Sequence, residues 1–545
     1  MGGVRSIARS GGWREMIHRS ISVNATASSL RPNARFSAMA DSARPPVLIV
    51  GAGPTGLVLA LWLIRAGVPV RIVDKNATPA MESRALAIAA RTLEYYDQLG
   101  IAARVIAAGT VFRGANVWNS QGRAAHISFS DIGGGISRYP FALVYPQDQH
   151  ERLLVDELER AGTHVERPVE FIGLAQRSDG VDVTLRHADG TLERLDAAYV
   201  AACDGAHSPI RAELGIGFDG GTYERLFYVA DVAGSGGAIN GEVNVGLGNN
   251  DFIAAFPMKE AGRARVVGTV APASTLGHEP TWDDVDETTL DLLHLHVDRV
   301  AWFATYRVHH RVATAFRDRR VFLLGDAAHV HSPLGGQGMN TGIADAVDLG
   351  WRLADVIHER AHDRVLASYE TERIAFARRL VATTDRAFAI IASPEDGART
   401  ARALLPRLAA FGSRFRPLRR QLFRAISQTA VNYRMSAISV GEFLSVHGGD
   451  RLPWVAPGDL DEPGDNYAPL AERRWHLQAF APLAPDVRAF CDGHGVPVHE
   501  FRLRPGARTP LSPGAIYLVR PDGYLGLVAE RNAVDRLEEY WRPLT

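Results

Sequence analysis

The segment that most constrains the fold is an apolar run that ends in a glycine-rich turn, at residues 47–56. Four apolar residues lead into Gly-Ala-Gly-Pro-Thr-Gly, an apolar helical pattern follows, and a second apolar run ends at Asp74. This order predicts a strand, a helix and a parallel strand in one right-handed unit. In such a unit Gly51 makes the tight turn, Gly53 lets a pyrophosphate approach the backbone, and Gly56 lets the helix pack closely on the strand.

An acidic residue about 20 residues after such a turn commonly binds the ribose hydroxyls of a dinucleotide. Asp74 stands in that position, and we expect it to lie at the cofactor together with the adjacent Lys75. The alternative is a purely structural glycine turn, which the matching strand, helix and acid argue against. FAD and NAD both fit this half of the pattern, so it leaves the cofactor open.

A second segment of nucleotide-binding type begins where the apolar run 321–324 ends, at Gly325 and Asp326. It continues through a glycine-rich turn into a long apolar helical pattern. The first amides of a helix are unpaired and the helix dipole points at them, so such a terminus favours an anionic or electron-rich ligand. By itself the segment predicts a carboxylate at the end of a strand and free amides at the start of a helix.

Length, charge and cysteine content exclude several classes. A chain of 545 residues is long enough for two or three domains. The net charge of −1 gives no electrostatic case for a nucleic acid or a membrane, and no apolar run reaches the ~18 residues of a membrane span. Cys203 and Cys491 lie far apart without metal-type spacing, and His329 and His331 lack a third ligand, so we expect no metal site.

The first 44 residues are rich in arginine and serine and poor in acids. One interpretation is an organellar transit peptide. The other, slightly favoured, is an over-extended gene start with the true start at Met39, which implies a cytoplasmic protein. The segment is expected to be disordered in either case.

The rest of the chain predicts an α/β protein. After a Rossmann-like unit, residues 222–312 form a strand-rich block that suits a sheet covering a ligand. Residues from 355 to about 435 show a helical, arginine-rich pattern, and strands and turns return from about 450.

Three separated motifs resemble the FAD-dependent aromatic-ring hydroxylases, the class A flavoprotein monooxygenases that include p-hydroxybenzoate and phenol hydroxylases. They are the turn at 51–56, the segment 204–211 and the block that begins at Gly325. The likeness covers roughly residues 45–440. The tail, especially residues 520–523, resembles the thioredoxin-like domain of the phenol hydroxylase branch, although it has no Cys-x-x-Cys and a redox role is doubtful.

The resemblance implies a domain organisation. Residues 1–44 would be the extension, and residues 45–400 an FAD- and NAD(P)-binding domain with an interleaved substrate sheet at about 222–312. A helical connector would follow at 401–440, and a thioredoxin-like domain at 441–545.

The resemblance also implies how FAD is held. Asp326 should hydrogen-bond the ribityl chain, and the turn at 335–340 should present backbone amides to the pyrimidine edge, where reduced flavin carries negative charge. Arg84 matches a family arginine near the phosphates, and Gln147 a glutamine that contacts FAD; for both, a surface or capping role is the alternative. The expected cofactor-binding residues are Gly51, Gly53, Gly56, Asp74, Lys75, Arg84, Gln147, Asp204, Gly205, Gly325, Asp326, Pro333, Gly336, Gly338, Met339 and Asn340.

Asp204 and Gly205 form the family's motif for both FAD and NAD(P)H, and Arg211 is expected to hold Asp204 by an ion pair. No fingerprint marks a separate NAD(P)H domain, so NADH and NADPH are not distinguished. Tyr306 resembles a substrate-contacting tyrosine of phenol hydroxylases and is the expected catalytic side chain, with a core tyrosine as the alternative.

One position departs from the family. Where phenol hydroxylases carry an aspartate suited to deprotonating the phenol, this chain has Leu86. Either another group removes that proton, or the substrate differs from simple phenols.

The resemblance implies a single-component monooxygenase. NAD(P)H would reduce FAD, and O2 would form a C4a-hydroperoxyflavin that hydroxylates an aromatic, phenolic ring. The implied partners are a small aromatic substrate and O2, with a homodimer as one form of assembly. The alternatives are a flavin-dependent oxidase or dehydrogenase without oxygen insertion, and a non-catalytic FAD-binding protein.

Overall fold

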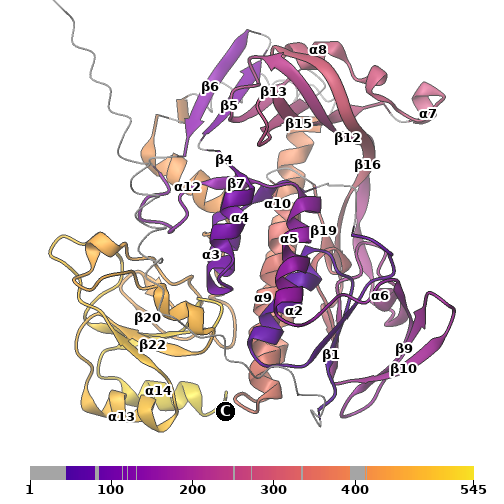
Figure 1. Ribbon diagram of the computed structural model, residues 1–545. Coiled ribbons are helices and arrows are strands. Elements are labelled where there is room, and N and C mark those ends of the chain that lie inside the picture. Colours follow the sequence, from indigo (N-terminus) through magenta and orange to yellow (C-terminus); the bar gives the residue numbers. More distant parts are fainter. Residues whose placement is uncertain are drawn as a thin grey trace, which may run out of the picture. The chain divides into compact units, whose positions relative to one another are not determined.

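The computed structural model describes residues 44–544 apart from 80–84, 113, 120, 130–131, 249–251, 272, 333–335, 393–410 and 413. The predictions for residues 1–43, for Arg84 and for Pro333 therefore lie outside the described residues. Residues 45–545 form one compact unit, shown in Figure 1. The structure confirms the predicted mixed α/β fold class.

A five-stranded sheet forms the centre of the nucleotide-binding part, in the order β17-β18-β11-β1-β2. The pairings from β18 to β2 are parallel, and β17 adds an antiparallel edge. Every residue of β1, β11 and β18 is buried, as expected for parallel strands covered on both faces. The strands are β1 (Val47–Val50), β2 (Val70–Val73), β11 (Tyr199–Ala202), β17 (Arg317–Asp318) and β18 (Val321–Leu323).

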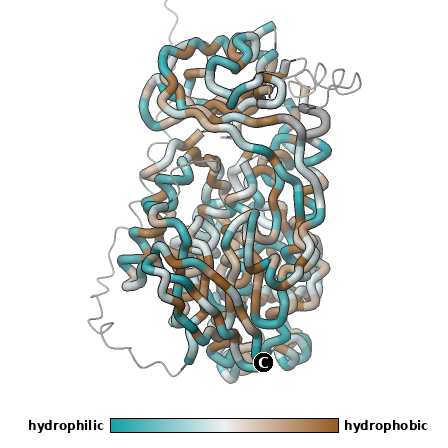
Figure 2. The backbone as a smooth tube through the Cα atoms, turned by 90° about the vertical axis from the view of Figure 1, so that its right-hand side faces the viewer, coloured by the Kyte–Doolittle hydropathy of each residue, from teal (hydrophilic) through white to brown (hydrophobic). Residues whose placement is uncertain are grey.

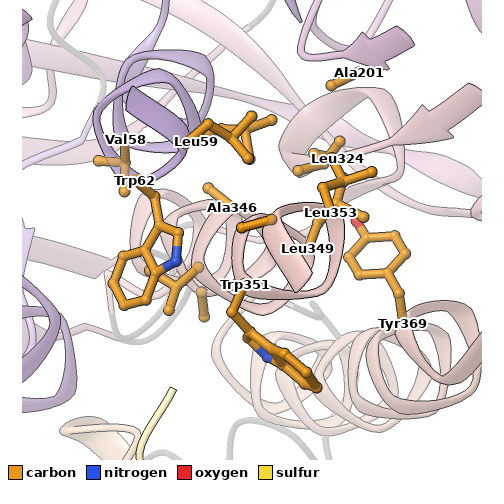
Figure 3. Packing of buried hydrophobic residues seen from close by; sticks show 14 of the residues in the cluster. Val58, Leu59, Trp62, Ala201, Leu324, Ala346, Leu349, Trp351, Leu353 and Tyr369 are labelled. Atoms are coloured by element: carbon orange, nitrogen blue, oxygen red, sulfur yellow. The ribbon is translucent and has the colours of Figure 1, made fainter. Parts of the chain in front are cut away.

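Two helices, α2 (Pro54–Arg65) and α9 (Gly338–Ile357), cross in close contact beside this sheet. A Cβ atom on Gly342 would lie 2.3 Å from Thr55 Oγ1, and one on Gly350 would lie 2.7 Å from Trp62 Cδ1. The missing side chains let the helix backbones approach closely. Figure 3 shows Trp62 of α2 facing the apolar side chains of α9.

Other helices and two small sheets complete this part. One sheet has the order β10-β9-β8 and the other β3-β7-β4. The helices are α3 (Ala90–Gln98), α4 (Ala102–Ala108), α5 (Gln147–Arg160), α6 (Pro209–Glu213), α10 (Val365–Ala392) and α12 (Arg416–Ile426), and the strands are β3 (Ala87–Ile88), β4 (Thr110–Phe112), β7 (Ala142–Val144), β8 (Val169–Gln176), β9 (Val181–His187) and β10 (Leu192–Ala197).

The strand-rich block forms most of an eight-stranded sheet in the order β19-β16-β12-β15-β14-β13-β5-β6. Three strands lie outside the predicted block: β5 and β6 come from residues 114–128, and β19 from residues 329–330. In Figure 2, hydrophobic and hydrophilic segments alternate in the upper part of the picture, where this sheet lies. The elements are β5 (Gly114–Asn119), β6 (Gly122–Ser128), β12 (Phe218–Gly236), β13 (Val243–Leu247), β14 (Phe252–Pro257), β15 (Arg263–Val270), β16 (Leu295–Ala313) and β19 (His329–Val330), with α7 (Ala273–Leu276) and α8 (Glu287–Asp291).

The C-terminal part has a four-stranded sheet in the order β23-β22-β24-β25. A parallel pair, β22 and β23, is joined through α13, and the other pairings are antiparallel. This is the arrangement expected of a thioredoxin-like domain, while the boundaries at 400 and 440 stay predictions. The elements are β20 (Glu442–Phe443), β21 (Val446–His447), β22 (His476–Ala479), α13 (Pro485–Gly493), β23 (Val498–Glu500), β24 (Ala515–Val519), β25 (Leu525–Glu530) and α14 (Val534–Trp541).

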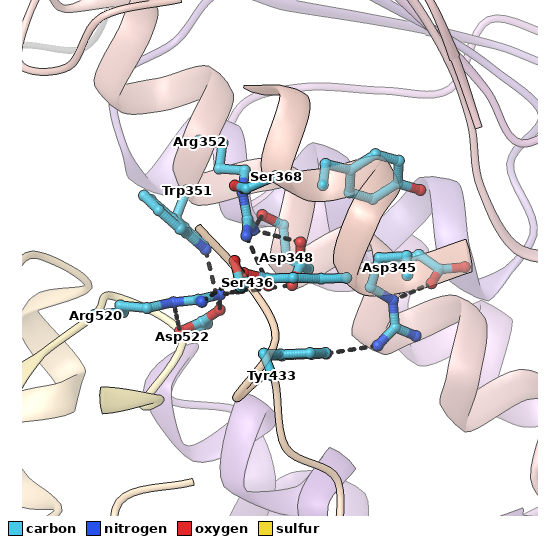
Figure 4. Close-up of polar contacts among 12 residues, drawn as sticks. Asp345, Asp348, Trp351, Arg352, Ser368, Tyr433, Ser436, Arg520 and Asp522 are labelled. Carbon is cyan, nitrogen blue, oxygen red and sulfur yellow. Dashed lines mark hydrogen bonds and ion pairs between the residues drawn. The ribbon is translucent and has the colours of Figure 1, made fainter. Parts of the chain in front are cut away.

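A buried ion network ties the C-terminal part to α9 and α10 (Figure 4). The guanidinium of Arg520, just after β24, donates to both carboxylate oxygens of Glu372, at 2.9 and 3.0 Å, and to Asp522 at 2.6 Å. Arg352 of α9 donates to the same Glu372 at 2.7 Å. Burial acts to raise the pKa of Glu372, but the two guanidinium groups hold it below the ordinary value.

Truncation of Arg520 is expected to destabilise the protein strongly. Arg520 is fully buried. Its loss would leave the buried negative charges of Glu372 and Asp522 with less positive charge to balance them. We therefore expect Arg520→Ala to lower the free energy of unfolding by about 3–5 kcal/mol, measured by denaturant titration. The control is Arg536→Ala in the exposed pair with Glu539, which should cost less than about 1 kcal/mol. Equal losses for the two variants would contradict this account of the network.

Candidate functional site

The motifs found in the sequence follow four neighbouring strands that end in one row. Val73, Val50, Ala202 and Leu323 are paired across the sheet at the carboxyl ends of β2, β1, β11 and β18. Ligands of open parallel sheets bind at this edge. The sheet register therefore brings the three separated motifs together.

The glycine-rich turn is closely packed on one side and open on the other. Gly51 has φ +102°, and a Cβ there would lie 2.2 Å from the carbonyl oxygen of Cys203. A Cβ on Gly56 would lie 2.0 Å from the carbonyl oxygen of Gly51. At Gly53, which precedes α2, a Cβ would meet nothing within 4 Å. The geometry thus leaves open space at Gly53, the position expected to face a pyrophosphate.

Asp74 lies at the end of β2 and contacts the same turn. Its carboxylate accepts hydrogen bonds from the backbone amides of Ala52 and Asn76, both at 2.8 Å. The guanidinium of Arg167, which the sequence gave no reason to single out, lies 3.3 Å from it. The neighbouring Lys75 is exposed. Asp74 therefore fixes the glycine-rich turn whether or not it also contacts a ribose.

The second motif begins directly after β11. Burial raises the pKa of the Asp204 carboxyl, whose Oδ1 is buried without a hydrogen-bond partner while Oδ2 accepts from the amide of Ile210 at 3.3 Å. Gly205 has φ +85° with open space around a Cβ. Ser208 caps α6 by accepting from the amide of Arg211 at 3.0 Å, a structural role.

The expected ion pair between Arg211 and Asp204 is wrong. No ion pair joins them among the described residues; the Arg211 guanidinium instead donates to the carbonyl oxygens of Ala206 and Ala327, each at 2.8 Å. A buried guanidinium needs hydrogen-bond acceptors, and carbonyl oxygens supply them here. Arg211 therefore connects the second motif to the third.

The third motif places an exposed carboxylate among buried residues. Asp326 is exposed, although residues 321–325 before it and Ala327 after it are buried. Gly325 has φ +57°, and a Cβ there would lie 2.7 Å from Thr55 Oγ1. Glycine is thus required where the chain turns beside α2, and the turn leaves Asp326 at the open edge of the sheet.

A second acid of this motif, Asp345, is fully buried and has three donors. Its carboxylate accepts from the amide of Gly325 at 2.9 Å, from Arg373 Nε at 2.5 Å and from His329 Nε2 at 2.8 Å. Burial acts to raise the pKa of Asp345, but Arg373 and His329 outweigh it and hold the pKa below the ordinary value. Sequence analysis missed Asp345 and Arg373, although an acid inside an apolar helical pattern is a signal that could have found the first.

The start of α9 follows the third motif. Gly336 has φ +63°, and a Cβ on Gly338 would have no neighbour closer than 3.8 Å, which leaves room at the helix start. Met339 packs partly against the main core. The Asn340 side chain makes four hydrogen bonds within the protein, all at 2.8 Å. It accepts from Ala89 N and Thr92 Oγ1 and donates to Ala87 O and Gly336 O.

Gln147, the first residue of α5, makes a local contact. Its Oε1 accepts from the amide of Ala85 at 3.2 Å, and its Nε2 donates to Glu151 at 2.8 Å. Gln147 thereby binds the chain at Ala85, directly after residues 80–84. Its contact with a cofactor stays a prediction.

One face of the eight-stranded sheet carries an apolar, aromatic cluster that we call the aromatic face. Tyr306 of β16 lies on it, paired in register with Phe227 of β12 at 5.9 Å between ring centroids. The aromatic face comprises Phe227, Val229, Leu247, Phe252, Ala254, Val267 and Val308, with Tyr223, Trp302 and Tyr306 at its border. Tyr306 is therefore a half-buried ring at the border of this cluster, and its role as a substrate contact stays a prediction.

The residues at the sheet edge fit the chemistry of FAD. A pyrophosphate needs a close backbone approach, which the open space at Gly53 allows. A polyhydroxylated chain needs an accessible acceptor, and Asp326 is exposed at the strand end. The buried Oδ1 of Asp204 has no hydrogen-bond partner among the described residues, as expected of a group that a ligand completes.

Comparison with known proteins agrees with this site. A family model described as an FAD binding domain matches residues 44–384. The chain is 32% identical to 6-methylpretetramide 4-monooxygenase of Streptomyces rimosus, over 90% of this chain and 92% of the relative. It is 34% identical to pentachlorophenol 4-monooxygenase of Sphingobium chlorophenolicum, over 65% and 66%. The solved structure of the anhydrotetracycline hydroxylase of Streptomyces rimosus superposes with a TM-score of 0.74 at 28% identity, over 92% of this chain and 99% of that one.

The chain belongs to the FAD binding domain family of flavin monooxygenases. It is an FAD-dependent oxidoreductase of the aromatic-hydroxylase type that uses NAD(P)H as reductant. The resemblance of the three motifs is thereby confirmed. Among the described residues, no helix is both long and apolar enough to span a bilayer.

Two glycine substitutions should separate cofactor approach from packing. Gly53→Ala adds a methyl group to open space, so we expect unchanged stability of the apoprotein and weaker FAD binding. Gly56→Ala places a methyl group against backbone and should lower the free energy of unfolding by about 1–3 kcal/mol. Thermal unfolding of the apoprotein and FAD titration measure the two effects. A Gly53→Ala variant with unaltered FAD affinity would refute the assignment of the open side to the pyrophosphate.

Proposed function

We propose that the protein hydroxylates a phenolic ring of a fused-ring aromatic substrate, with one atom of O2 entering the ring. The single observation that carries the proposal is the aromatic face of the large sheet, a buried apolar cluster bordered by the half-buried rings of Tyr223, Trp302 and Tyr306. Support also comes from relatives named for 6-methylpretetramide, pentachlorophenol and anhydrotetracycline.

We propose roles for the residues at the sheet edge. Gly53 would receive the pyrophosphate together with the start of α2, in a turn that Gly51 and Gly56 allow to pack closely. Asp326 would accept hydrogen bonds from the ribityl hydroxyl groups. The backbone amides at the start of α9, from Gly336 to Asn340, would face the flavin pyrimidine edge, and their dipole would stabilise negative charge there. Asp204 and Gly205 would complete the site from β11.

Bound FAD supplies the redox chemistry, hydride acceptance from NAD(P)H and activation of O2. The chain orients the ring of the substrate against the aromatic face and excludes water from it. Tyr306 would contact the substrate. NAD(P)H would reach the flavin from the solvent-exposed side of the site.

Isotope labelling tests oxygen insertion directly. We expect substrate-dependent NAD(P)H oxidation with one labelled oxygen atom in the product when the reaction is run under labelled O2, measured by mass spectrometry. A screen of phenols and fused-ring aromatics, with peroxide assayed alongside, supplies the substrate. A product without the label would favour an oxidase or dehydrogenase, and no NAD(P)H oxidation with any compound would favour a non-catalytic FAD-binding protein.

Removal of the Asp326 carboxylate should weaken FAD binding. A hydrogen bond to a charged acceptor contributes about 1.5–3 kcal/mol, so Asp326→Ala should lower FAD affinity about ten- to hundredfold, seen as loss of the bound yellow chromophore. Asp298→Ala, at another exposed carboxylate, is the control. Retention of FAD with wild-type affinity in Asp326→Ala would show that the assigned role is wrong.

We further propose a cytoplasmic location. The alternative is an organellar location.

A further inference from the structure

Helix α12 and the residues before it expose apolar side chains. Phe411 is 60% exposed, Phe415 49%, Leu418 52% and Leu422 38%. Leu418 and Leu422 lie four residues apart on one face of α12, and Phe415 is its N-cap. The rings of Phe411 and Phe415 are in contact, with 5.0 Å between their centroids. We call these four side chains the apolar stripe.

The protein holds α12 by another face. Phe423 is buried in an apolar cluster with Phe129 and Ile132, and the centroids of the Phe423 and Phe129 rings lie 6.4 Å apart. In Figure 1, α12 lies at the edge of the molecule, near the end of the large sheet that β5 and β6 form. A surface helix normally has one apolar face, which packs on the core. In α12 the core takes Phe423 and leaves the apolar stripe exposed.

Arginines flank the apolar stripe. Arg414, Arg416 and Arg424 are exposed, and the sequence has no aspartate or glutamate from residue 397 to residue 441. Burial, and then the like charges of Arg416 and Arg424, lower the pKa of Arg420. The net charge of −1 for the whole chain therefore conceals a local excess of positive charge around the stripe.

The positive charge decides which partner fits the apolar stripe. A symmetric dimer would pack the same surface of two copies together, and the arginines of one copy would then repel those of the other. An anionic lipid surface has acyl chains beneath a layer of phosphate groups, so it can receive the apolar side chains and pair with the guanidinium groups at the same time. Arginine on the polar side and Phe and Leu on the other are typical of helices that lie in the plane of a membrane surface.

We propose that α12 docks the protein on anionic lipid bilayers. The apolar stripe enters the interface of one leaflet, and Arg414, Arg416 and Arg424 lie at the lipid phosphates. The contact is peripheral and partly electrostatic, so it is reversible and weakens as salt screens the charges. The docking surface lies outside the proposed FAD site, and the inference does not depend on the proposed hydroxylation.

Vesicle co-sedimentation of the FAD-loaded protein tests the docking. One set of vesicles contains phosphatidylcholine and phosphatidylglycerol in equal parts, and the other contains phosphatidylcholine alone. We expect the protein to sediment with the anionic vesicles at low salt, to be released from them at high salt, and to stay in the supernatant with the neutral vesicles. Absence of sedimentation with the anionic vesicles, or equal sedimentation with both kinds, would overturn the proposal.

Two double variants separate the apolar and the charged contributions. Leu418→Ser with Leu422→Ser removes apolar side chains that would enter the interface, and should lower the affinity for anionic vesicles at least about tenfold. Arg416→Gln with Arg424→Gln should lower it about fivefold for each arginine and reduce its dependence on salt. All four side chains are exposed, so thermal unfolding and FAD content should stay at the wild-type values.

The matched controls are Leu192→Ser and Arg299→Gln. Both residues are exposed, but they lie on β10 and β16 and outside the apolar stripe, so these variants should bind the vesicles as the wild type does. Wild-type affinity in both double variants would show that α12 is not the docking surface. Light scattering tests the other partner: a dimer that the Leu418→Ser and Leu422→Ser variant dissociates would assign the stripe to a second copy and overturn the proposal. Because sedimentation needs no turnover, its outcome is distinct from that of the hydroxylation assay.

Discussion

The cofactor-binding part depends on one buried carboxylate, that of Asp345. It has no exposed surface, and its donors come from the turn after β18, from β19 and from α10, through Gly325, His329 and Arg373. A single charge on α9 therefore fixes the position of the strand end that carries Asp326. Loss of a partner from such a buried pair typically costs about 3–5 kcal/mol, so this carboxylate holds the turn after β18, β19, α9 and α10 together.

The helices α9 and α10 also hold the C-terminal part. Arg373 donates to the hydroxyl of Tyr433 at 2.6 Å, and Arg352 of α9 shares Glu372 of α10 with Arg520. Cys491 is buried in α13, and burial raises its thiol pKa to about 11, unlike a redox-active thiol. The C-terminal part therefore packs against α9 and α10, the helices beside the candidate site.

Several elements were predictable because they depend on local patterns. The run from 47 to 74 predicted β1, α2 and β2, since strand, turn and helix signals lie within one short segment. Other features were not predictable. The ion pair assigned to Arg211 was wrong because carbonyl oxygens satisfy the guanidinium equally well, and sequence gives no information on which acceptor lies nearer. The pairing of Tyr223 with Asp385 joins residues 162 apart in sequence, a contact that no spacing rule encodes.

The sequence by itself determined the nucleotide-binding class of fold and the three motifs by which the chain resembles its family, because glycine turns and strand-end acids are chemically constrained at short range. The tertiary structure decided which side chains those motifs use internally and which they leave exposed. The Asp74 carboxylate accepts a hydrogen bond from its own turn, and the Asn340 side chain is engaged in hydrogen bonds within the protein. Asp326, in contrast, is exposed. The tertiary structure also joined α10 to the large sheet through the hydrogen bond from Tyr223 to Asp385, which only the packing of a helix on a distant sheet can form.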